Sequence, residues 1–584
     1  MSCLQSVPLW RKKFSALFLS NLSSAGMLFA CAVSVAMAQT PLDPSPELRR
    51  QQERQESERQ RQQPNVDVRG PEVQADPAAG LIRLPLNETP CFPIVQIELA
   101  GPEASEFLWV LDHLDGPAND DSAMRRCVGA QGINVLLKRA QDALIARGYV
   151  TSRTLAQPQD ISQGKVAISI VAGRIREIRY AQPDYSRNPA IAVLPLQAGR
   201  ILNLRDVEQA LEILKRAPTA EADIKIEPGQ APGESDLVIT YQQAKPFRLN
   251  LSLDDSGSAS SGKYQAATTL SYDNWWTAND LFYITLNHDV GGGDPGARGT
   301  KGRSLHYSIP LGYWTLAFNG SASNYFQTVA GASQDYIYSG SSENGDVKFS
   351  RLMYRDASRK FSMSLRGFYR ASQNFIDDTE VLVQRRKIGG LEIGANYREF
   401  IGRATVDLNL NYKRGTGAFG SLPSPEEAFG EGTSRFRLAT ADANVSLPFK
   451  IKEQNLRYTA NWRAQWNRTP LTSQDRFSIG SRYSVRGFNG ENSLSAERGY
   501  TLRNELAWSL DASGQELYFG LDHGRVSGYS AQNLIGKALS GIAIGLRGGF
   551  KGLQYDLFVG RPVSKPDGFR ASQSTGGFNL NFSF

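Results

Sequence analysis

Few residues of this sequence have the types and spacing that catalysis or metal binding requires. The four histidines are His113, His288, His306 and His523, and none stands at metal-ligand spacing or in a Ser/His/Asp arrangement. His523 directly follows Asp522, but adjacent residues of a strand point to opposite faces, so the two would not form a dyad. The sequence therefore predicts no enzyme and indicates no catalytic residue, no metal site and no cofactor.

Cysteines could form a disulfide or bind a metal ion. Of the four cysteines, Cys3 and Cys31 lie in the N-terminal segment interpreted below as a signal peptide, which leaves Cys91 and Cys127 for the mature chain. Two cysteines in an exported protein favour one structural disulfide, with two free thiols as the alternative. Neither has a histidine or another cysteine nearby at the spacing of a metal site.

The N-terminus has the pattern of an export signal. Three basic residues, 11–13, precede an apolar stretch, 14–35, and a small-x-small motif ends at Ala38. This order predicts a signal peptide over residues 1–38. A lipoprotein cleavage box at 28–31 is the alternative, but it contains a poorly fitting phenylalanine. No later segment has about 18 or more consecutive apolar residues, so we expect no membrane-spanning helix.

The C-terminus has the pattern of a membrane-facing strand. From Ser574 onward, Phe578, Leu580, Phe582 and Phe584 alternate with small or polar residues. Side chains of a strand alternate between its two faces, so one face of this segment is apolar and the other is polar. A strand of an outer-membrane barrel needs this pattern. The ending is also similar to the C-terminal signal that directs such barrels to their assembly in the outer membrane.

The composition fits a barrel with a polar lumen. Hydrophobic residues make up 41% of the chain, mean hydropathy is -0.36, and glycine, phenylalanine and tyrosine number 54, 27 and 22. Polar lumen residues hide the membrane signal from any hydropathy average. The net charge of +7 comes from 65 basic and 58 acidic residues mixed along the chain, which indicates solvated surfaces and no nucleic-acid partner.

Residues 246–584 are predicted to form strands throughout. Clear alternation occurs at 404–413 and 456–467, where Leu, Tyr and Trp alternate with Arg, Asn and Thr. A soluble sandwich would also alternate, but with fewer arginines on its polar face and fewer large aromatics on the other. Strands of about 10 residues with turns give about sixteen strands, which leave an aqueous lumen. The predicted fold class is membrane all-β, a 16-stranded antiparallel outer-membrane β-barrel.

Two small modules of similar order are predicted before the barrel, at 91–173 and 174–245. Each reads β-α-α-β-β and is large enough for a small core. The expected elements of the first are strands at 94–99, 149–155 and 165–171 and helices at 105–114 and 133–147. Those of the second are strands at 174–180, 224–227 and 236–241 and helices at 187–194 and, capped by Asn203, up to Lys215.

A polar segment precedes these modules. Residues 39–64 contain a run of Gln, Glu, Arg and Ser without an apolar face, ended by Pro64. These are good helix formers with i,i+3 and i,i+4 charge pairs, and a helix that is polar all round is either solvated or lies in a wet channel. The alternative is a disordered linker. Residues 65–90, rich in Pro, Asp and Gly, are predicted to be a linker.

A long connection departs from the strand rhythm between Arg468 and Arg498. It contains the quartet Val485, Arg486, Gly487 and Phe488. Connections of this length are usually functional or disordered. The quartet resembles the signature of the sixth extracellular loop in the TpsB (two-partner secretion) branch of the Omp85 superfamily, which includes the ShlB/FhaC/HecB-like haemolysin secretion/activation proteins.

The resemblance extends over essentially the whole mature chain. The two modules resemble the paired POTRA domains of this branch, and the polar segment 39–64 resembles its N-terminal plug helix. The spacing of Cys91 and Cys127 resembles that of the haemolysin activators. In this family the sixth loop folds into the lumen, and its arginine pairs with an aspartate on the inner wall.

This resemblance implies a latch between Arg486 and Asp522. The segment from Leu517 to Gly524 is similar to the family pattern, and counting by twos turns Gly520 and Asp522 inward. A glycine there leaves space for the loop to approach the wall. A guanidinium can bind a carboxylate through two parallel hydrogen bonds, so the pair is physically reasonable. The alternative is that Arg486 is a solvated loop arginine.

The resemblance also implies the function. The expected protein is a pore-forming transporter in the outer membrane of a Gram-negative cell, with its POTRA domains in the periplasm, that exports an unfolded exoprotein without ATP. Expected partners are a TpsA-type exoprotein (haemolysin, adhesin or contact-dependent inhibition toxin), the barrel assembly machinery and membrane lipid, and the protein is expected to be a monomer. The alternatives are an insertase of the same superfamily, a passive porin and an outer-membrane enzyme.

Overall fold

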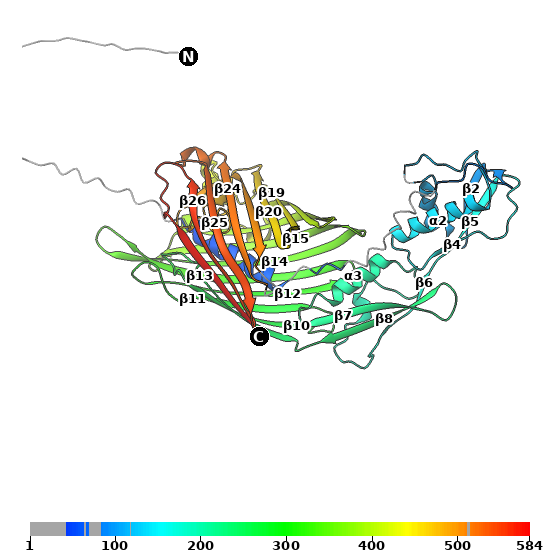
Figure 1. The fold of residues 1–584 in the computed structure, drawn as a ribbon. Helices are drawn as coiled ribbons and strands as arrows, with labels where there is room; N and C mark the ends of the chain where they lie inside the picture. Colours follow the sequence, from blue (N-terminus) through cyan, green and yellow to red (C-terminus); the bar gives the residue numbers. More distant parts are fainter. Residues whose placement is uncertain (1–42, 64–65, 69–82, 117, 511–513) are drawn as a thin grey trace, which may run out of the picture. The chain divides into compact units, whose positions relative to one another are not determined.

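The protein is described by a computed structural model that covers residues 43–63, 66–68, 83–116, 118–510 and 514–584. It contains an N-terminal helix, two small α/β modules and a β-barrel (Figure 1). The predicted signal peptide, 1–38, lies outside the described residues. In the described part of the chain, no helix is long and apolar enough to cross a membrane, and no group of three or more potential ligands could hold a metal ion.

The barrel has the predicted sixteen antiparallel strands and is closed. Its strands are β9 (Phe247–Asp254), β10 (Gln265–Asp273), β11 (Leu281–Asp289), β12 (Arg298–Leu311), β13 (Trp314–Ala330), β14 (Asp335–Arg355), β15 (Arg359–Ile376), β17 (Arg386–Ile401), β18 (Ala404–Thr416), β19 (Arg437–Ile451), β20 (Gln454–Asn467), β23 (Arg498–Ser509), β24 (Glu516–Ser527), β25 (Ala538–Phe550), β26 (Leu553–Ser564) and β27 (Thr575–Ser583). A two-residue strand, β16 (Thr379–Glu380), extends the hairpin at the end of β15. Closure gives each of these sixteen strands a neighbour on both sides.

The last strand closes the barrel against the first. β27 pairs antiparallel with β9, with Leu580 opposite Leu253 and Phe582 opposite Leu251. Beyond the strand, the backbone N–H of Phe584 donates to the carbonyl of Leu249 at 3.0 Å. The predicted apolar face of this segment therefore forms part of the outer surface, while its service as an assembly signal stays a prediction.

Alternation along the strands separates a lipid face from a lumen face. On β18, Leu408, Leu410 and Tyr412 are exposed on the outside, while Asp407 and Lys413 line the interior. The polar residues of the alternating pattern therefore line a wet interior, as the composition indicated.

The first module has the predicted order. Its elements are β1 (Phe92–Pro93), β2 (Gln96–Ala100), the 3₁₀ helix η2 (Ala104–His113), β3 (Cys127–Val128), α2 (Ala130–Ala146), β4 (Arg153–Leu155) and β5 (Lys165–Val171). The sheet runs β2-β5-β4, with β2 parallel and β4 antiparallel to β5. The strand predicted at 149–155 is shorter than expected, because residues 149–152 form a turn in which the backbone N–H of Ser152 donates to the carbonyl of Tyr149 at 3.2 Å.

The second module repeats this topology. It contains β6 (Arg174–Tyr180), the 3₁₀ helix η3 (Ile191–Val193), α3 (Leu204–Leu214), β7 (Ala220–Pro228) and β8 (Glu234–Gln243), with the sheet order β6-β8-β7. Asn203 caps α3 as predicted, since its side chain accepts from the backbone N–H of Arg205 at 2.8 Å. The helix predicted at 187–194 is wrong in extent. Pro189 disfavours helix at the preceding residue, and its carbonyl accepts a hydrogen bond from Tyr180.

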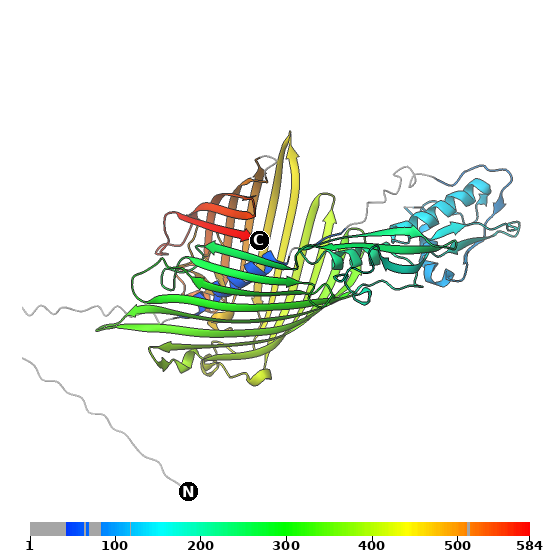
Figure 2. The same ribbon diagram turned by 90° about the horizontal axis from the view of Figure 1, so that it is seen from below.

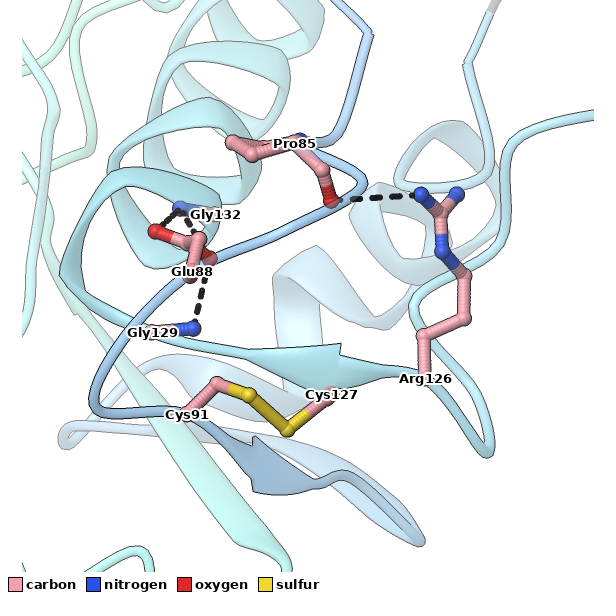
Figure 3. The surroundings of a disulfide bond; sticks show 7 residues. All are labelled: Pro85, Glu88, Cys91, Arg126, Cys127, Gly129 and Gly132. Carbon is pink, nitrogen blue, oxygen red and sulfur yellow. Dashed lines mark hydrogen bonds between the residues drawn. A yellow bond between two sulfur atoms is a disulfide. The ribbon is translucent and has the colours of Figure 1, made fainter.

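Residues 83–90, predicted as part of a linker, are attached to the first module (Figure 3). Glu88 accepts backbone hydrogen bonds from Gly129, Gln131 and Gly132 at the start of α2, where the helix has N–H groups without intrahelical partners. Cys91 and Cys127 form a disulfide that ties the end of this segment to β3. Residues 83–90 thus have fixed partners on the first module through Glu88 and the disulfide.

The same segment has a second attachment at Asp121. The side chain of Leu84 is buried in the module's core, and its backbone N–H donates to Asp121 at 2.8 Å. Asp121 also accepts from Arg126 and Arg139. Burial acts to raise the pKa of Asp121, but these hydrogen bonds outweigh it and lower the pKa to about 2.

Candidate functional site

Helix α1 (Ser45–Gln62) lies inside the barrel (Figure 2). At its beginning, Ser45 is 2.8 Å from the hydroxyl of Ser473, which belongs to the connection between β20 and β23. At its end, Gln62 accepts from Arg248 at 3.0 Å and from Asn250 at 3.2 Å, both on β9. An α-helix rises 1.5 Å per residue, so 18 residues extend about 27 Å between the two attachments.

The contacts explain why such a polar sequence forms a helix here. Within α1, Glu47 bonds to Arg50 and Gln51, one turn onward. Toward the barrel, Glu47 accepts from Ser261 at 2.9 Å, and Arg50 donates to the carbonyl of Gly490 at 2.6 Å. Polar lumen and loop groups thus supply partners that an isolated helix would lack, so the alternative of a disordered segment does not hold for residues 45–62.

The long connection between β20 and β23, hereafter loop six (468–497), has its own fold. It contains the 3₁₀ helix η7 (Ser473–Asp475) and a small hairpin of β21 (Phe477–Ile479) and β22 (Leu494–Ala496). The hairpin packs on residues from β24 and β25, and the buried members of this apolar cluster are Phe477, Ile479, Val485, Phe488, Leu494, Ala496, Val526, Ala531, Leu539 and Phe569. Burial of these side chains fixes the loop in one conformation.

The four residues of the quartet divide into two kinds of contact. Val485 and Phe488 belong to the apolar cluster, where Phe488 meets Phe569 edge-on at 5.9 Å. Gly487 has φ +100° and passes close to the wall, since a Cβ built on it would lie 2.4 Å from the carbonyl oxygen of Arg561. Only glycine adopts such a backbone freely. The apolar pair therefore holds the loop while the other two residues face β24 and β26.

Arg486 is buried against two carboxylates of the inner wall. Its Nε and Nη2 donate to the two oxygens of Asp522 on β24, each at 2.8 Å, and its backbone N–H donates to the same carboxylate at 2.9 Å. Its Nη1 donates to Glu505 on β23 at 2.5 Å. The Asp522 side chain is 0% exposed and that of Arg486 6%. The arrangement is bidentate and charge-assisted, the strongest class of side-chain hydrogen bond.

Two more arginines extend this network along the wall. Arg503 on β23 lies 3.6 Å from Asp522, and Arg547 on β25 contacts Glu505 at 2.8 Å and Glu516 at 2.9 Å. Each carboxylate thus has at least two cationic neighbours. Burying an unpaired charge costs much free energy, whereas burying arginines and carboxylates that pair with one another costs far less.

Glycines of three strands make room for Arg486 and Gly487. A Cβ on Gly520 would lie 2.5 Å from the guanidinium carbon of Arg486, and one on Gly541 would lie 1.9 Å from its carbonyl oxygen. A Cβ on Gly560 would lie 3.0 Å from Gly487. Any other residue at the first two positions would collide with the loop, so the inner wall is shaped to receive it.

The chain beyond α1 runs to a second ionic cluster. Asp67 contacts Lys360 and Arg398 of the barrel, each at 2.9 Å. The backbone N–H of the next residue, Val68, donates to Glu212 of α3 at 2.9 Å, and Arg355 donates to its carbonyl at 2.6 Å. Residues 66–68 are thereby fixed between the barrel and the second module.

Space remains in the lumen beside the helix. A polar cavity of about 1020 Å³ lies between α1 and the wall. Its lining includes Glu53, Glu56, Asp442, Arg463 and Arg503. The cavity lining thus carries both acidic and basic side chains. A charged polypeptide segment in the cavity, whether acidic or basic, would therefore find side chains of the opposite charge.

Sequence reasoning located part of this site. It named the quartet, Gly520 and Asp522, which the structure brings together, and it named Cys91 and Cys127, which are bonded. The phenylalanines of β27 lie elsewhere, on the outer surface. It missed Glu505, Arg547, Gly541 and Gly560, although the glycines within β25 and β26 were a signal of close approach to the inner wall.

Comparisons with known proteins agree with this architecture. The model of the haemolysin secretion/activation protein family (ShlB/FhaC/HecB) matches residues 233–548. A ShlB-type POTRA domain matches residues 92–173, and a further POTRA domain matches 174–228. Together these ranges cover nearly all of the two modules and the barrel as far as β25.

Several characterised proteins are similar over most of their length. The outer membrane transporter CdiB-2 of Burkholderia pseudomallei is 34% identical over 95% of this chain and 98% of its own. The hemolysin transporter protein ShlB of Serratia marcescens is 24% identical over 77% of this chain and 78% of its own. The solved structure of CdiB from Acinetobacter baumannii is 27% identical, covers 93% of this chain and all of its own, and superposes with a TM-score of 0.81.

Proposed function

This chain belongs to the ShlB/FhaC/HecB family of haemolysin secretion/activation proteins, and we propose that α1 and loop six together gate its channel. The protein is an outer-membrane transporter of two-partner secretion (type Vb), with its POTRA domains in the periplasm and an exoprotein as its cargo. The similar proteins CdiB-2 and ShlB are transporters, which favours export of an exoprotein over the insertase alternative.

In the resting transporter, α1 is proposed to be the plug that closes the channel. The observation that carries it is that α1 has attachments at both ends of its length, to loop six at Ser473 and to β9 at Arg248 and Asn250. These contacts are hydrogen bonds between polar groups, which water can replace when the helix leaves. The resting plug is therefore stable but removable.

Loop six is the latch of the proposal. The pair of Arg486 and Asp522, supported by Glu505, holds the loop against β24 while the apolar cluster fixes its hairpin. Because loop six is held in this way, it stays in place on the inner wall of the barrel while α1 leaves the lumen and the cargo passes. The role of these residues in secretion is proposed from this geometry.

The driving force is proposed to be binding and folding of the cargo. No ATP is available at the outer membrane, so capture in the periplasm and folding outside the cell supply the free energy. The sheet of the second module has β6 and β7 at its edges, and an extended polypeptide can add to such an edge through backbone hydrogen bonds.

The cargo is proposed to be a contact-dependent inhibition toxin rather than a haemolysin or adhesin. The support is that the CdiB transporters are the more identical relatives, at 34% for the Burkholderia protein against 24% for the hemolysin transporter of Serratia. We further propose that the barrel assembly machinery inserts the protein by way of Phe578, Leu580, Phe582 and Phe584, and that it works as a monomer in contact with membrane lipid.

Deletion of residues 39–63 tests the plug. In planar bilayers, the deletion variant should conduct steadily, while the intact protein should be mostly closed, because the helix occupies the lumen. The variant Q52A/Q60A is the matched control, since both glutamines are exposed side chains of α1, and it should conduct like the intact protein. Equal conductance of the deletion variant and the intact protein would refute the plug.

A further inference from the structure

Three arginines stand side by side near one end of neighbouring strands β18, β19 and β20. Arg414 of β18 is directly opposite Arg437 of β19 in the strand register. On the other side, the backbone N–H of Arg468, which follows β20, donates to the carbonyl of Arg437 at 2.9 Å. Figure 1 shows β19 and β20 as adjacent strands. Directly opposed residues have Cβ atoms about 5 Å apart, so three cations are held in one row.

The row faces the outside of the barrel. The residues that line the lumen cavity are odd-numbered on β18, such as Lys413, and all but one are even-numbered on β19, such as Asp442. Arg414 and Arg437 have the opposite parity, and Arg468 shares the parity of Trp466, which is 45% exposed on the outer face. All three arginines are exposed. They are therefore outside the path proposed for the cargo.

The row lies at the outer-leaflet end, just beyond an aromatic row. Two residues below the arginines in the register come Tyr412, Ala439 and Trp466. Tyrosine and tryptophan gather at the membrane–water interface, so the next row outward lies at the headgroups. The connections of these strands at this end are long (417–436 and 468–497), whereas at the other end two residues join β17 to β18 and two join β19 to β20. Barrels place long loops outside the cell.

The three arginine side chains have no partner among the residues that the structure describes. In this part of the chain, the guanidinium groups of Arg414, Arg437 and Arg468 form no salt bridge and no hydrogen bond; Arg437 donates only its backbone N–H, to the hydroxyl of Thr469 at 3.0 Å. Two acids of the connecting loop are engaged elsewhere, Glu426 with Arg386 and Glu427 with the hydroxyl and backbone groups around Ser434. Like charges directly opposite one another destabilise a sheet, so the arrangement calls for an anion from outside the chain.

We propose that this row, the arginine row, is a binding site for the phosphate groups of the outer-leaflet glycolipid, lipopolysaccharide. Arginine binds phosphate bidentately, and a row of cations at headgroup level is the arrangement that recognises anionic lipid. The aromatic row and the exposed Leu408 and Leu410 beneath it provide an apolar surface for the acyl chains. The combination of phosphate-binding and acyl-binding surfaces is what selects a lipid over a free anion.

Lipid binding to the full-length protein in dodecyl maltoside tests the proposal. The probes are bisphosphorylated lipid A, the same lipid after removal of both phosphates, and inorganic phosphate. The variant R414Q/R437Q/R468Q should bind bisphosphorylated lipid A at least tenfold more weakly than the wild type, and the rise in melting temperature that this lipid gives the wild type should disappear. Replacement by lysine should retain more of the affinity than replacement by glutamine.

The matched control removes three cations from turns at the opposite end of the barrel, as R403Q/K452Q/K551Q. This control should keep wild-type affinity. The proposal is overturned if the arginine-row variant binds as the wild type does, if the control loses affinity equally, or if lipid without phosphates binds as tightly. Displacement of lipid A by equimolar inorganic phosphate would also overturn it, because the site would then be one for a free anion. Heat-modifiable gel mobility checks folding, and R437Q alone, at the centre of the row, repeats the test if the triple variant fails to fold.

Discussion

Arg486 is a buried cation matched by carboxylates from two different strands. Asp522 provides both oxygens to it, and Glu505 provides one. Its neighbours Val485 and Phe488 anchor the same turn in an apolar cluster. The apolar cluster thus fixes the position of the guanidinium, and the two carboxylates balance its charge. A lysine in its place would keep the charge and lose the bidentate geometry.

A double-mutant cycle measures this coupling. R486Q leaves two buried carboxylates with fewer cations, and we expect it to lower the free energy of unfolding by about 3 kcal/mol, the lower end for breaking a buried pair, because Arg503 and Arg547 remain. D522N should cost a similar amount. The double variant should cost clearly less than the sum.

Urea unfolding in detergent, followed by tryptophan fluorescence, provides these values. N461A, a substitution at a lumen-facing position away from the latch, serves as the control and should be close to neutral. Strictly additive costs of R486Q and D522N would contradict the described coupling.

Of the residues around Arg486, the sequence predicts only those that belong to a recognisable motif. Asp522 and Gly520 were named because the strand from Leu517 to Gly524 resembles a family pattern. Glu505 and Gly541 were not, because their nearness to Arg486 depends on the register of β23 and β25 with β24. Register is set by pairing between strands and is not present in any one of them.

Residues distant in sequence hold both helix α1 and the segment that precedes the first module. Residues 83–90 were assigned to a linker from their composition, yet Glu88 caps α2 and the disulfide fixes Cys91 (Figure 3). Helix α1 was predicted from its helix formers, but its stability in the fold comes from lumen groups such as Asn250. Composition indicates propensity, whereas partners remote in sequence decide the outcome.

Removal of the disulfide tests how residues 83–90 are held. The cysteines are 36 residues apart, and a loop of that length corresponds to about 3–4 kcal/mol of stabilisation. C91S/C127S should therefore increase hydrogen exchange in peptides covering 83–128, while peptides of the second module keep their protection. Unchanged exchange in 83–128 would show that the Glu88 and Asp121 contacts suffice alone.

For the whole molecule, the order of parts could be predicted and their mutual contacts could not. Periodicity of two indicated strands, the length of residues 246–584 indicated that there are about sixteen, and the repeated β-α-α-β-β pattern indicated the two modules. The cluster joining Asp67, Glu212 and Arg398 unites three parts of the chain, and no local pattern indicates it. Such contacts depend on closure of the barrel, which only the complete chain achieves.

Locking α1 in place tests the central claim that the helix must leave for cargo to pass. The hydroxyls of Ser45 and Ser473 are 2.8 Å apart, so S45C/S473C should form a disulfide between the helix and loop six. Secretion of the cognate exoprotein by cells should be lost while this bond is intact and should return on reduction, with S45C alone secreting normally throughout. Undiminished secretion with the bond fully formed would contradict the gated channel.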